Sequence, residues 1–238
     1  MNGETEELGL GVGAVERMAS VGSVGGDSVA LASNVAVLCL AAGCARRMGR
    51  LKQLLPWRDT TVLQAALRPY RDLNMQPLVL VVGANSAEIM ESLEPGWRNI
   101  CHLVRNERWR EGMATSLVEG TRYLMGWERE RNCRFAGVMV GLGDMPLLTA
   151  SAIEKLLAAF GTGKEDRIVA PVWQGRRGHP VIIGREYWPE LLELQGDRGA
   201  APILRRHGDK VRMVEADEAV CRDVDTPEQW KALQEEYI

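Results

Sequence analysis

Cationic residues follow the first strongly apolar segment of the chain, after a turn of very small side chains. Residues 35–40 read VAVLCL, residues 41–43 read Ala-Ala-Gly, and the cations that follow include Arg47 and Lys52. Small residues let backbone N–H groups approach an anion closely, and neighbouring cations offset the charge of that anion. This stretch therefore predicts a binding site for the phosphates of a nucleoside triphosphate.

Two common phosphate-binding motifs are absent from this stretch. A Walker loop requires GxxxxGK[ST], but Gly43 is followed six residues later by Gly49 and then by Arg50. A dinucleotide fingerprint requires GxGxxG, and only Gly43 and Gly49 are present. The loop is poor in glycine and rich in cations. This indicates a phosphate chain that itself reacts, with charge building up on a leaving group.

Carboxylates occur at two later turns of the chain. Asp144 stands in GDMP directly after an apolar segment, and Asp223 and Asp225 stand in DVDTP before the last predicted helix. Each aspartate alone is explained equally well, without a metal, as a turn residue or a helix cap. For Asp223 and Asp225 this is because Thr226-Pro227 indicates a helix start just after them. Two aspartates beside a triphosphate loop instead match a Mg²⁺ site in which the ion keeps several waters and bridges substrate phosphates.

Strands and helices alternate along the chain, which predicts an α/β fold with a mostly parallel sheet. Right-handed crossovers would place all strand carboxyl ends on one edge, so Gly43, Gly83 and Asp144 should meet there. Ser86 and Thr149 are the expected helix caps. Strands are expected at 35–40, 78–84, 100–104, 134–140, 167–170, within 173–184 and at 211–214, and helices at 60–73, 86–93, 112–127, 149–160, 187–194, 200–207 and the C-terminus.

The composition is that of a single globular domain at 35–238, preceded by an extension at 1–34 that we expect to be disordered. The chain has 238 residues, of which 46% are hydrophobic and 26% charged, and its net charge of −3 argues against a dedicated nucleic-acid binder. No apolar run approaches the ~20 residues that span a bilayer, so no membrane span is expected. The five cysteines form no CxxC pair, which favours reduced thiols in a cytoplasmic protein.

Residues 40–56, LAAGCARRMGRLKQLLP, are similar to the signature LAAGxSxRMGxxKxLLP of MobA-like nucleotidyltransferases. The chain most resembles the molybdenum cofactor cytidylyltransferases within that class. Five further family segments occur in order, as NERWREGMATSLVEG, GDMP, RGHPV, GDRGA and DVDTPE. One departure is Ala45, which replaces the serine of the signature and leaves open whether a hydroxyl helps to orient phosphate. The resemblance covers residue 35 to the C-terminal helix and implies a Rossmann-like three-layer α/β/α fold of the nucleotide-diphospho-sugar transferase type.

The resemblance also implies a reaction, which is the transfer of CMP from CTP to molybdenum-bearing molybdopterin with release of pyrophosphate. Arg47, Lys52 and Asp144 would be the catalytic residues, because Arg47 and Lys52 would hold the triphosphate and stabilise the leaving pyrophosphate. Asp144 and Asp225 would hold Mg²⁺, and Asp223 is a weaker candidate. Arg46 is equally well explained as a solvated charge.

Two sets of binding residues are carried over from the family. The implied nucleotide contacts are Leu40, Ala41, Ala42, Gly43, Arg47, Lys52, Gly83, Gly112 and Ser116. The implied acceptor contacts are Arg177, Gly178, His179, Asp197 and Gly199. The LAAG sequence favours CTP, since the guanylyl-transferring branch tends to read LAGG. A simple turn explains Gly83 and His179 without a ligand, and core packing is the default for Trp109 and Trp173, although either indole near these loops is also a candidate for stacking on a pterin.

Three alternatives stay open at this point. A related enzyme would use GTP, or would use a sugar or alcohol phosphate as acceptor, although RGHP and GDRGA resemble the cofactor branch specifically. A non-catalytic chaperone would instead deliver molybdenum cofactor to a molybdenum hydroxylase apoenzyme. The joint presence of Arg47, Lys52, Asp144 and Asp225 argues against a loss of catalysis.

Overall fold

The computed structural model of the protein describes residues 34–43, 51–83 and 85–237. The expected N-terminal extension, apart from Asn34, lies outside these residues, and so do Cys44, Ala45, Arg46 and Arg47 of the opening loop. No helix in the described ranges is long and apolar enough to cross a membrane.

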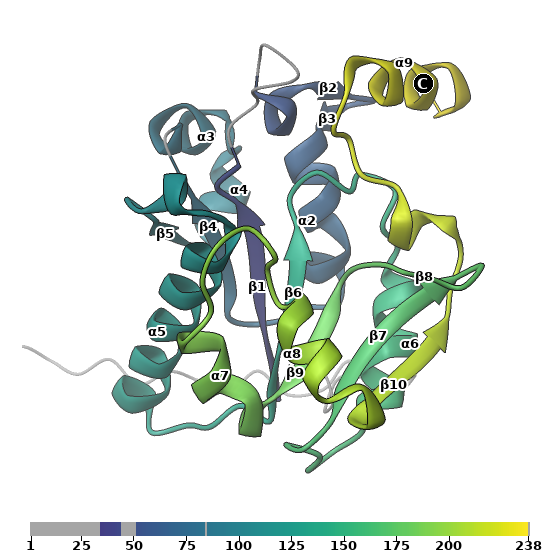
Figure 1. Ribbon diagram of the computed structural model, residues 1–238. Helices are drawn as coiled ribbons and strands as arrows, with labels where there is room; N and C mark the ends of the chain where they lie inside the picture. Colours follow the sequence, from purple (N-terminus) through teal and green to yellow (C-terminus); the bar gives the residue numbers. More distant parts are fainter. Residues whose placement is uncertain (1–33, 44–50, 84, 238) are drawn as a thin grey trace, which may run out of the picture.

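The described residues form an eight-stranded, mostly parallel sheet in the order β10-β7-β9-β6-β1-β4-β5, with β8 paired to β7 (Figure 1). β1 (Val35–Ala41) lies between β6 and β4, and all seven of its residues are buried. A strand covered on both faces is apolar throughout, which explains the absence of polar alternation in this segment. The remaining strands are β4 (Leu78–Val82), β5 (Cys101–Arg105), β6 (Gly137–Leu142), β7 (Ile168–Trp173), β8 (Arg176–Arg177), β9 (Val181–Gly184) and β10 (Val211–Glu215).

β9 corrects the expectation that every strand carboxyl end shares one edge, because it pairs antiparallel with both β6 and β7. Val181 at its start is in register with Val140 near the end of β6. The beginning of β9, rather than its end, therefore lies at the carboxyl edge of the parallel strands. The antiparallel β7–β8 hairpin reverses the chain without a crossover helix, and it brings the RRGHP segment to the edge where ligands bind in such sheets.

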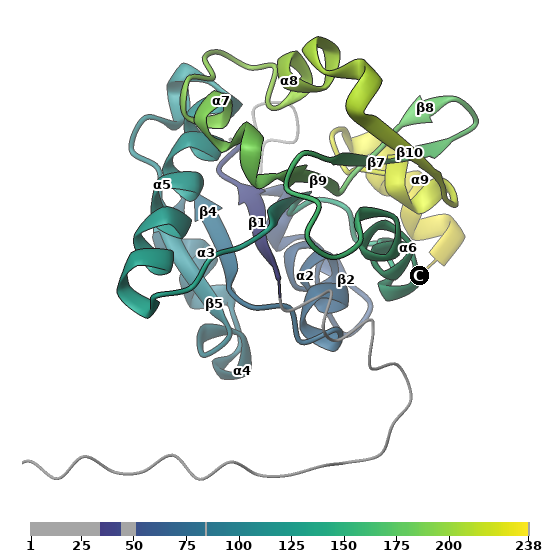
Figure 2. The same cartoon turned by 90° about the horizontal axis from the view of Figure 1, so that it is seen from below.

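Helices cover both faces of the sheet, as Figure 2 shows. Alternate residues of β1 pack into opposite layers, with Val37 and Cys39 in one core cluster and Leu38 and Leu40 in the other. The first layer contains α2 (Val62–Asp72), α3 (Ser86–Ser92), α4 (Pro95–Arg98) and α6 (Ala150–Phe160), and the second contains α5 (Met113–Arg131), α7 (Trp188–Leu192) and α8 (Ala201–Arg206). The predicted three-layer α/β/α fold with a mostly parallel sheet is confirmed.

Side-chain capping of helix starts is found at Thr149 and Thr61 but not at Ser86. Thr149 caps α6 as expected, since its side chain accepts a hydrogen bond from the N–H of Ala152. Thr61 caps α2 in the same way. The expectation for Ser86 is wrong, because the N-cap of α3 is Asn85 and no side-chain capping bond is formed there.

The C-terminal helix α9 (Pro227–Tyr237) packs against a small hairpin of β2 (Pro56–Trp57) and β3 (Thr60–Thr61), which sequence reasoning did not predict (Figure 1). The ring centroids of Trp57 in β2 and Trp230 in α9 lie 6.0 Å apart. This packing brings the segment before α9 to Lys52, which pairs with Asp225. Short 3-10 turns complete the chain at Lys52–Leu54, Trp109–Glu111, Arg185–Tyr187, Gly208–Lys210 and Glu218–Cys221.

Candidate active site

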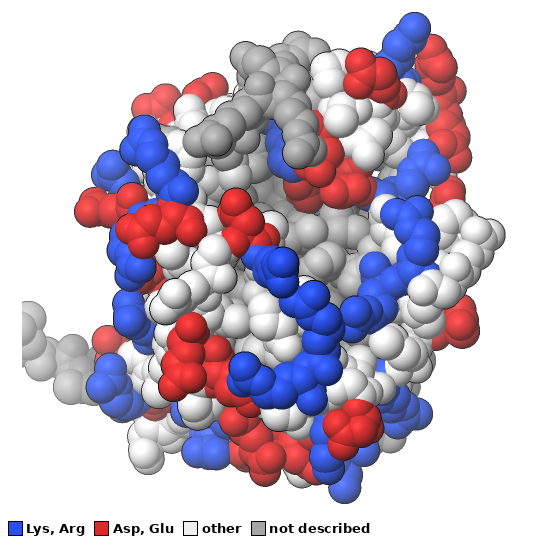
Figure 3. Space-filling view, in the orientation of Figure 1, with Lys and Arg blue, Asp and Glu red and all other residues white. Residues whose placement is uncertain are grey.

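Two pockets adjoin each other at the carboxyl edge of the parallel strands, where Figure 3 shows a hollow bordered by acidic and basic side chains. The acidic pocket has a volume of about 340 Å³, and its charged lining residues are Lys52, Arg110, Asp144, Asp197, Asp223 and Asp225. The arginine pocket has a volume of about 480 Å³, and its basic lining residues are Arg176, Arg177, His179 and Arg198. The two pockets share a wall made of Leu40, Met113 and Leu142.

Lys52 lies between two carboxylates in the acidic pocket. Its Nζ atom forms an ion pair with Asp144 Oδ2 and another, at 2.5 Å, with Asp225 Oδ1. The side chains of Lys52 and Asp144 are 15% and 13% exposed, so this pair is shielded from water, while Asp225 is 40% exposed. A hydrogen bond of 3.0 Å from the Val224 N–H to the Asp144 carbonyl holds the two aspartate-bearing loops together.

Burial and charge act in opposite directions on the pKa values of this group. Burial lowers the pKa of Lys52, but Asp144 and Asp225 outweigh that effect and the pKa lies above its ordinary value. Burial raises the pKa of Asp144 above its ordinary value, against the opposing effect of Lys52. The pKa of Asp223 is also raised, first by burial and then by the charges of Asp144 and Asp225. Crowded carboxylates of this kind favour a bound cation.

The residues of the acidic pocket fit a divalent cation that is held partly by substrate. Asp144 Oδ1 is buried and has no hydrogen-bond partner among the described residues, and the ammonium of Lys52 stands as a cation between Asp144 and Asp225. Within the described ranges, no three His, Cys, Asp or Glu side chains gather closely enough to hold a metal by themselves. Two carboxylates would leave coordination positions for further oxygen ligands, as hard divalent cations require.

The GDRGA loop is joined directly to the first turn of α5. Asp197 Oδ1 accepts a hydrogen bond of 3.1 Å from the N–H of Met113, and the carbonyl of Gly196 accepts one of 3.0 Å from the N–H of Ala114. Gly112 has φ of +116°, and a Cβ atom there would lie 2.5 Å from the backbone of Gly196. Only glycine fits this contact. The contact holds the GDRGA loop, part of which lines the arginine pocket, against the start of α5, which lines the acidic pocket.

The RRGHP turn is held in the arginine pocket by backbone contacts. The N–H of His179 donates to the carbonyl of Val220 at 2.8 Å. A Cβ atom on Gly178 would lie 2.0 Å from the same carbonyl oxygen, so a larger residue does not fit there. Burial lowers the pKa of His179, despite a hydrogen bond with the Val140 backbone and the charge of Asp223. The buried imidazole is therefore neutral at neutral pH.

The structure divides the predicted site residues between the two pockets. Leu40, Ala42, Gly43, Lys52, Ser116, Asp144 and Asp225 line the acidic pocket, and Arg177, Gly178, His179 and Gly199 line the arginine pocket. Asp197 was expected on the acceptor side but lines the acidic pocket. Ala41 is 3% exposed and packs in the core, and Gly83 and Gly112 make close backbone contacts behind the wall. Arg47 lies outside the described residues.

Sequence reasoning missed several residues that line or support the pockets. Gln53, Arg110 and Met113 line the acidic pocket. Trp109 was named only as a core residue or a candidate for stacking, and it also lines this pocket, with its indole against Gly83. Trp173 packs against the core. Arg176 and Arg198 stand inside the RRGHP and GDRGA segments, so the motif itself was the available signal. Asn106 likewise opens the NERWREGMATSLVEG segment, and it is buried behind the acidic pocket.

Comparisons with known proteins agree with this architecture. Residues 37–211 match the family model described as a MobA-like NTP transferase domain. Over 206 residues, the chain is 31% identical to nicotine blue oxidoreductase of Paenarthrobacter nicotinovorans, with 82% of this chain and 93% of that protein covered. Over 205 residues, it is 23% identical to molybdenum cofactor cytidylyltransferase of Escherichia coli strain K12, with 86% of this chain and 98% of that protein covered.

A solved structure also matches along most of the chain. Rv0371c of Mycobacterium tuberculosis H37Rv aligns with a TM-score of 0.72 at 28% identity, covering 86% of this chain and 99% of that one. A structure of Rv0371c in complex with manganese aligns with a TM-score of 0.68 at 26% identity, covering 85% of this chain and 99% of that one.

Proposed function

The chain belongs to the family of MobA-like NTP transferases, and we propose that it transfers CMP from CTP to molybdopterin carrying molybdenum. The products would be the cytosine dinucleotide form of the cofactor and pyrophosphate. The observation that carries this proposal is the position of Lys52 between Asp144 and Asp225, in a pocket that shares a wall with a second, basic pocket. Nucleotidyl transfer needs such a pair of neighbouring sites, because two phosphate-bearing substrates react with each other.

In the proposed reaction, a terminal phosphate oxygen of the acceptor attacks the α-phosphorus of CTP. The bond from that phosphorus to the bridging oxygen breaks, and pyrophosphate leaves opposite the attacking atom. Little covalent work falls to the protein, so catalysis consists of positioning and charge stabilisation. Lys52 and Arg47 would hold the triphosphate and stabilise the leaving pyrophosphate. Asp144 and Asp225 would hold Mg²⁺, which when bound supplies charge neutralisation to the phosphates.

The choice of substrates is supported on both sides of the shared wall. Ala42 and Ser116 line the acidic pocket, and the LAAG turn is the form that favours CTP over GTP. The arginine pocket combines Arg177 and Arg198 with apolar residues such as Leu117, which suits a flat heterocycle that bears a phosphate.

We also propose a cytoplasmic location and an apoenzyme partner of the molybdenum hydroxylase class. The four cysteines within the described residues are free thiols, as in a reducing compartment. The partner follows from the chemistry of the proposed product, because a finished cofactor has to pass to the enzyme that uses it.

A second candidate function is oxidoreduction, and the observation that favours it is the 31% identity to nicotine blue oxidoreductase. Oxidoreduction would give no role to the ion pairs that Lys52 forms with Asp144 and Asp225. The two functions are distinguished by adding nicotine blue with NADH or NADPH and following the loss of the blue colour.

The central experiment measures pyrophosphate release with each of the four NTPs, with and without molybdenum-bearing molybdopterin and Mg²⁺. We expect turnover with CTP only, and only when both acceptor and Mg²⁺ are present. Turnover with GTP equal to that with CTP, or the absence of turnover with all four nucleotides, would overturn the proposal. Bleaching of nicotine blue without any pyrophosphate release would favour the second candidate.

A further inference from the structure

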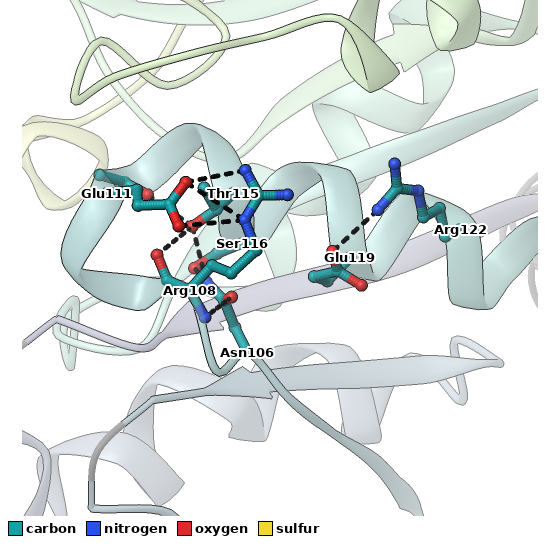
Figure 4. Close-up of polar contacts among 8 residues, drawn as sticks. Asn106, Arg108, Glu111, Thr115, Ser116, Glu119 and Arg122 are labelled. Atoms are coloured by element: carbon teal, nitrogen blue, oxygen red, sulfur yellow. Dashed lines mark hydrogen bonds and ion pairs between the residues drawn. The ribbon is translucent and has the colours of Figure 1, made fainter.

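Asn106 joins the end of β4 to the first turn of α5, and Figure 4 shows its side chain beside Thr115 and Ser116 of that helix. Its backbone N–H donates to the carbonyl of Val82 at 2.8 Å, which fixes it beside the end of β4. Its buried side-chain Nδ2 donates to Thr115 Oγ1 at 2.8 Å and to Ser116 Oγ at 2.9 Å. Ser116 lines the acidic pocket, so Asn106 is hydrogen-bonded to a residue of the pocket lining.

The backbone around this cluster determines which atom donates in each hydrogen bond. The N–H of Arg108 can only donate, and it meets the Asn106 side chain at 2.9 Å, so the atom that it meets is the amide oxygen. The two hydrogens of the amide nitrogen therefore point to Thr115 and Ser116. The hydroxyl of Thr115 donates to the carbonyl of Gly112 at 2.8 Å, which leaves its oxygen to accept from Asn106.

The same reasoning applied to Ser116 gives a directed donor at the pocket wall. Ser116 Oγ accepts from Asn106, so its own hydrogen is available for donation. Within the described part of the chain, the structure records no hydrogen bond donated by this hydroxyl, which is only 3% exposed. A buried donor without a partner is unfavourable, so a ligand in the acidic pocket is the natural acceptor.

We infer that Asn106 is a positioning residue: it orients the hydroxyl of Ser116, which is already an expected nucleotide contact, so that this hydroxyl donates a hydrogen bond to an acceptor atom of the base. This inference rests on the proposed function, because it takes the acidic pocket as the nucleotide site. The acceptor is a carbonyl oxygen or an unprotonated ring nitrogen, and cytosine carries both. An aspartate at position 106 would reverse the polarity, since its carboxylate would accept the Ser116 hydrogen and withdraw it from the base.

The test compares CTP with a ligand that has the phosphates but no base. Dissociation constants of CTP and of inorganic tripolyphosphate, both with Mg²⁺, are measured calorimetrically for wild type, Ser116→Ala, Asn106→Asp and the double variant. We expect the ratio of the CTP constant to the tripolyphosphate constant to rise about fivefold in each single variant, the size of one neutral hydrogen bond. The double variant should rise no further than Ser116→Ala, because Asn106 acts through Ser116.

The ratio separates base recognition from a merely structural or electrostatic role. A disturbed fold, or the new charge in Asn106→Asp, would weaken both ligands together and leave the ratio unchanged, which would overturn the inference. Arg122→Gln is the matched control, because Arg122 pairs with Glu119 on the exposed face of the same helix (Figure 4). A ratio that rises in Ser116→Ala but stays unchanged in Asn106→Asp would overturn only the role of Asn106. Wild type that binds no CTP would overturn the proposed function as well.

Discussion

The acidic pocket and the arginine pocket share a wall but carry opposite charge. The described lining of the acidic pocket holds four aspartates against the two cations Lys52 and Arg110. The described lining of the arginine pocket holds three arginines and no carboxylate. The described lining of the first pocket therefore attracts a cation, whereas that of the second attracts an anion.

If the proposed function is correct, this difference would let one fold bring two phosphate-bearing molecules together in spite of their mutual repulsion. In the acidic pocket, Lys52 lies between Asp144 and Asp225, so under the proposed function phosphate binding there would be coupled to the binding of a metal ion. In the arginine pocket, the cations are permanent. If the proposed function is correct, the nucleotide side depends on metal and the acceptor side does not.

Removing a carboxylate from the acidic pocket should have the largest effect. Asp144→Asn is expected to lower pyrophosphate release from CTP on the order of 10²–10³-fold, because the charge stabilisation of the phosphates is lost. Acceptor affinity should stay unchanged. Asp209→Asn, a change of an exposed aspartate outside both pockets, is the control. A variant that keeps more than a tenth of wild-type turnover would remove Asp144 from this role.

Lys52→Met should separate catalysis from metal affinity. Turnover is expected to fall about 100-fold, since a cation that stabilises the leaving group is removed. The affinity for Mn²⁺ without nucleotide should rise at the same time, because the ammonium no longer competes for Asp144 and Asp225. Electron paramagnetic resonance of free Mn²⁺ measures this affinity, with Lys155→Met on the exposed face of α6 as control. Weaker Mn²⁺ binding in Lys52→Met would contradict the competition.

Arg198→Gln tests the other pocket. The KM for the acceptor is expected to rise about tenfold, the size of one hydrogen bond to a charged group, while the KM for CTP stays the same. Arg205→Gln provides the matched change, since Arg205 is exposed on α8 and lies outside the lining of both pockets. An equal rise in both KM values would show that the two pockets do not divide the substrates as proposed.

The smallest effect is expected at the link between the pockets. Asp197→Ala removes the acceptor of the Met113 N–H bond and should lower the free energy of unfolding by about 1 kcal/mol, as for a lost helix cap. Both KM values should then rise together, because Ser116 and Gly199 lie on the two sides of this link. Asp197→Asn should restore stability and both KM values, since its amide oxygen still accepts. Thermal unfolding and steady-state kinetics give the two readings.

Much of the fold was readable from local pattern. Continuous apolar runs such as residues 35–40 predicted buried strands, because a strand covered on both faces is apolar throughout. Thr149 predicted the start of α6 because its hydroxyl caps the first turn. The carboxyl edge of a parallel sheet predicted that Gly43 and Asp144 would come together, and both line the acidic pocket.

Local sequence pattern did not predict the direction of a strand, the exact start of a helix or the contacts of a buried side chain, because these depend on tertiary packing. The sequence of β9 is as apolar as those of the parallel strands, so it does not reveal the direction of β9. That direction is visible only in the antiparallel pairing of β9 with β6 and β7. Ser86 has the chemistry of a cap, but the backbone enters α3 one residue earlier, at Asn85. The sequence placed Asn106 in a family segment without a role, and its hydrogen bonds to Thr115 and Ser116 became apparent only in the structure.

The amino-acid sequence by itself therefore determined the α/β class, the order of the elements and most of the residue types at the site. The tertiary structure alone decided which of them meet. Lys52 and Asp225 are 173 residues apart in the chain, and packing of α9 on the β2–β3 hairpin brings them together. Asp197 and Met113 are 84 residues apart. Such contacts depend on the joint burial of distant apolar surfaces, which no local spacing of residues encodes.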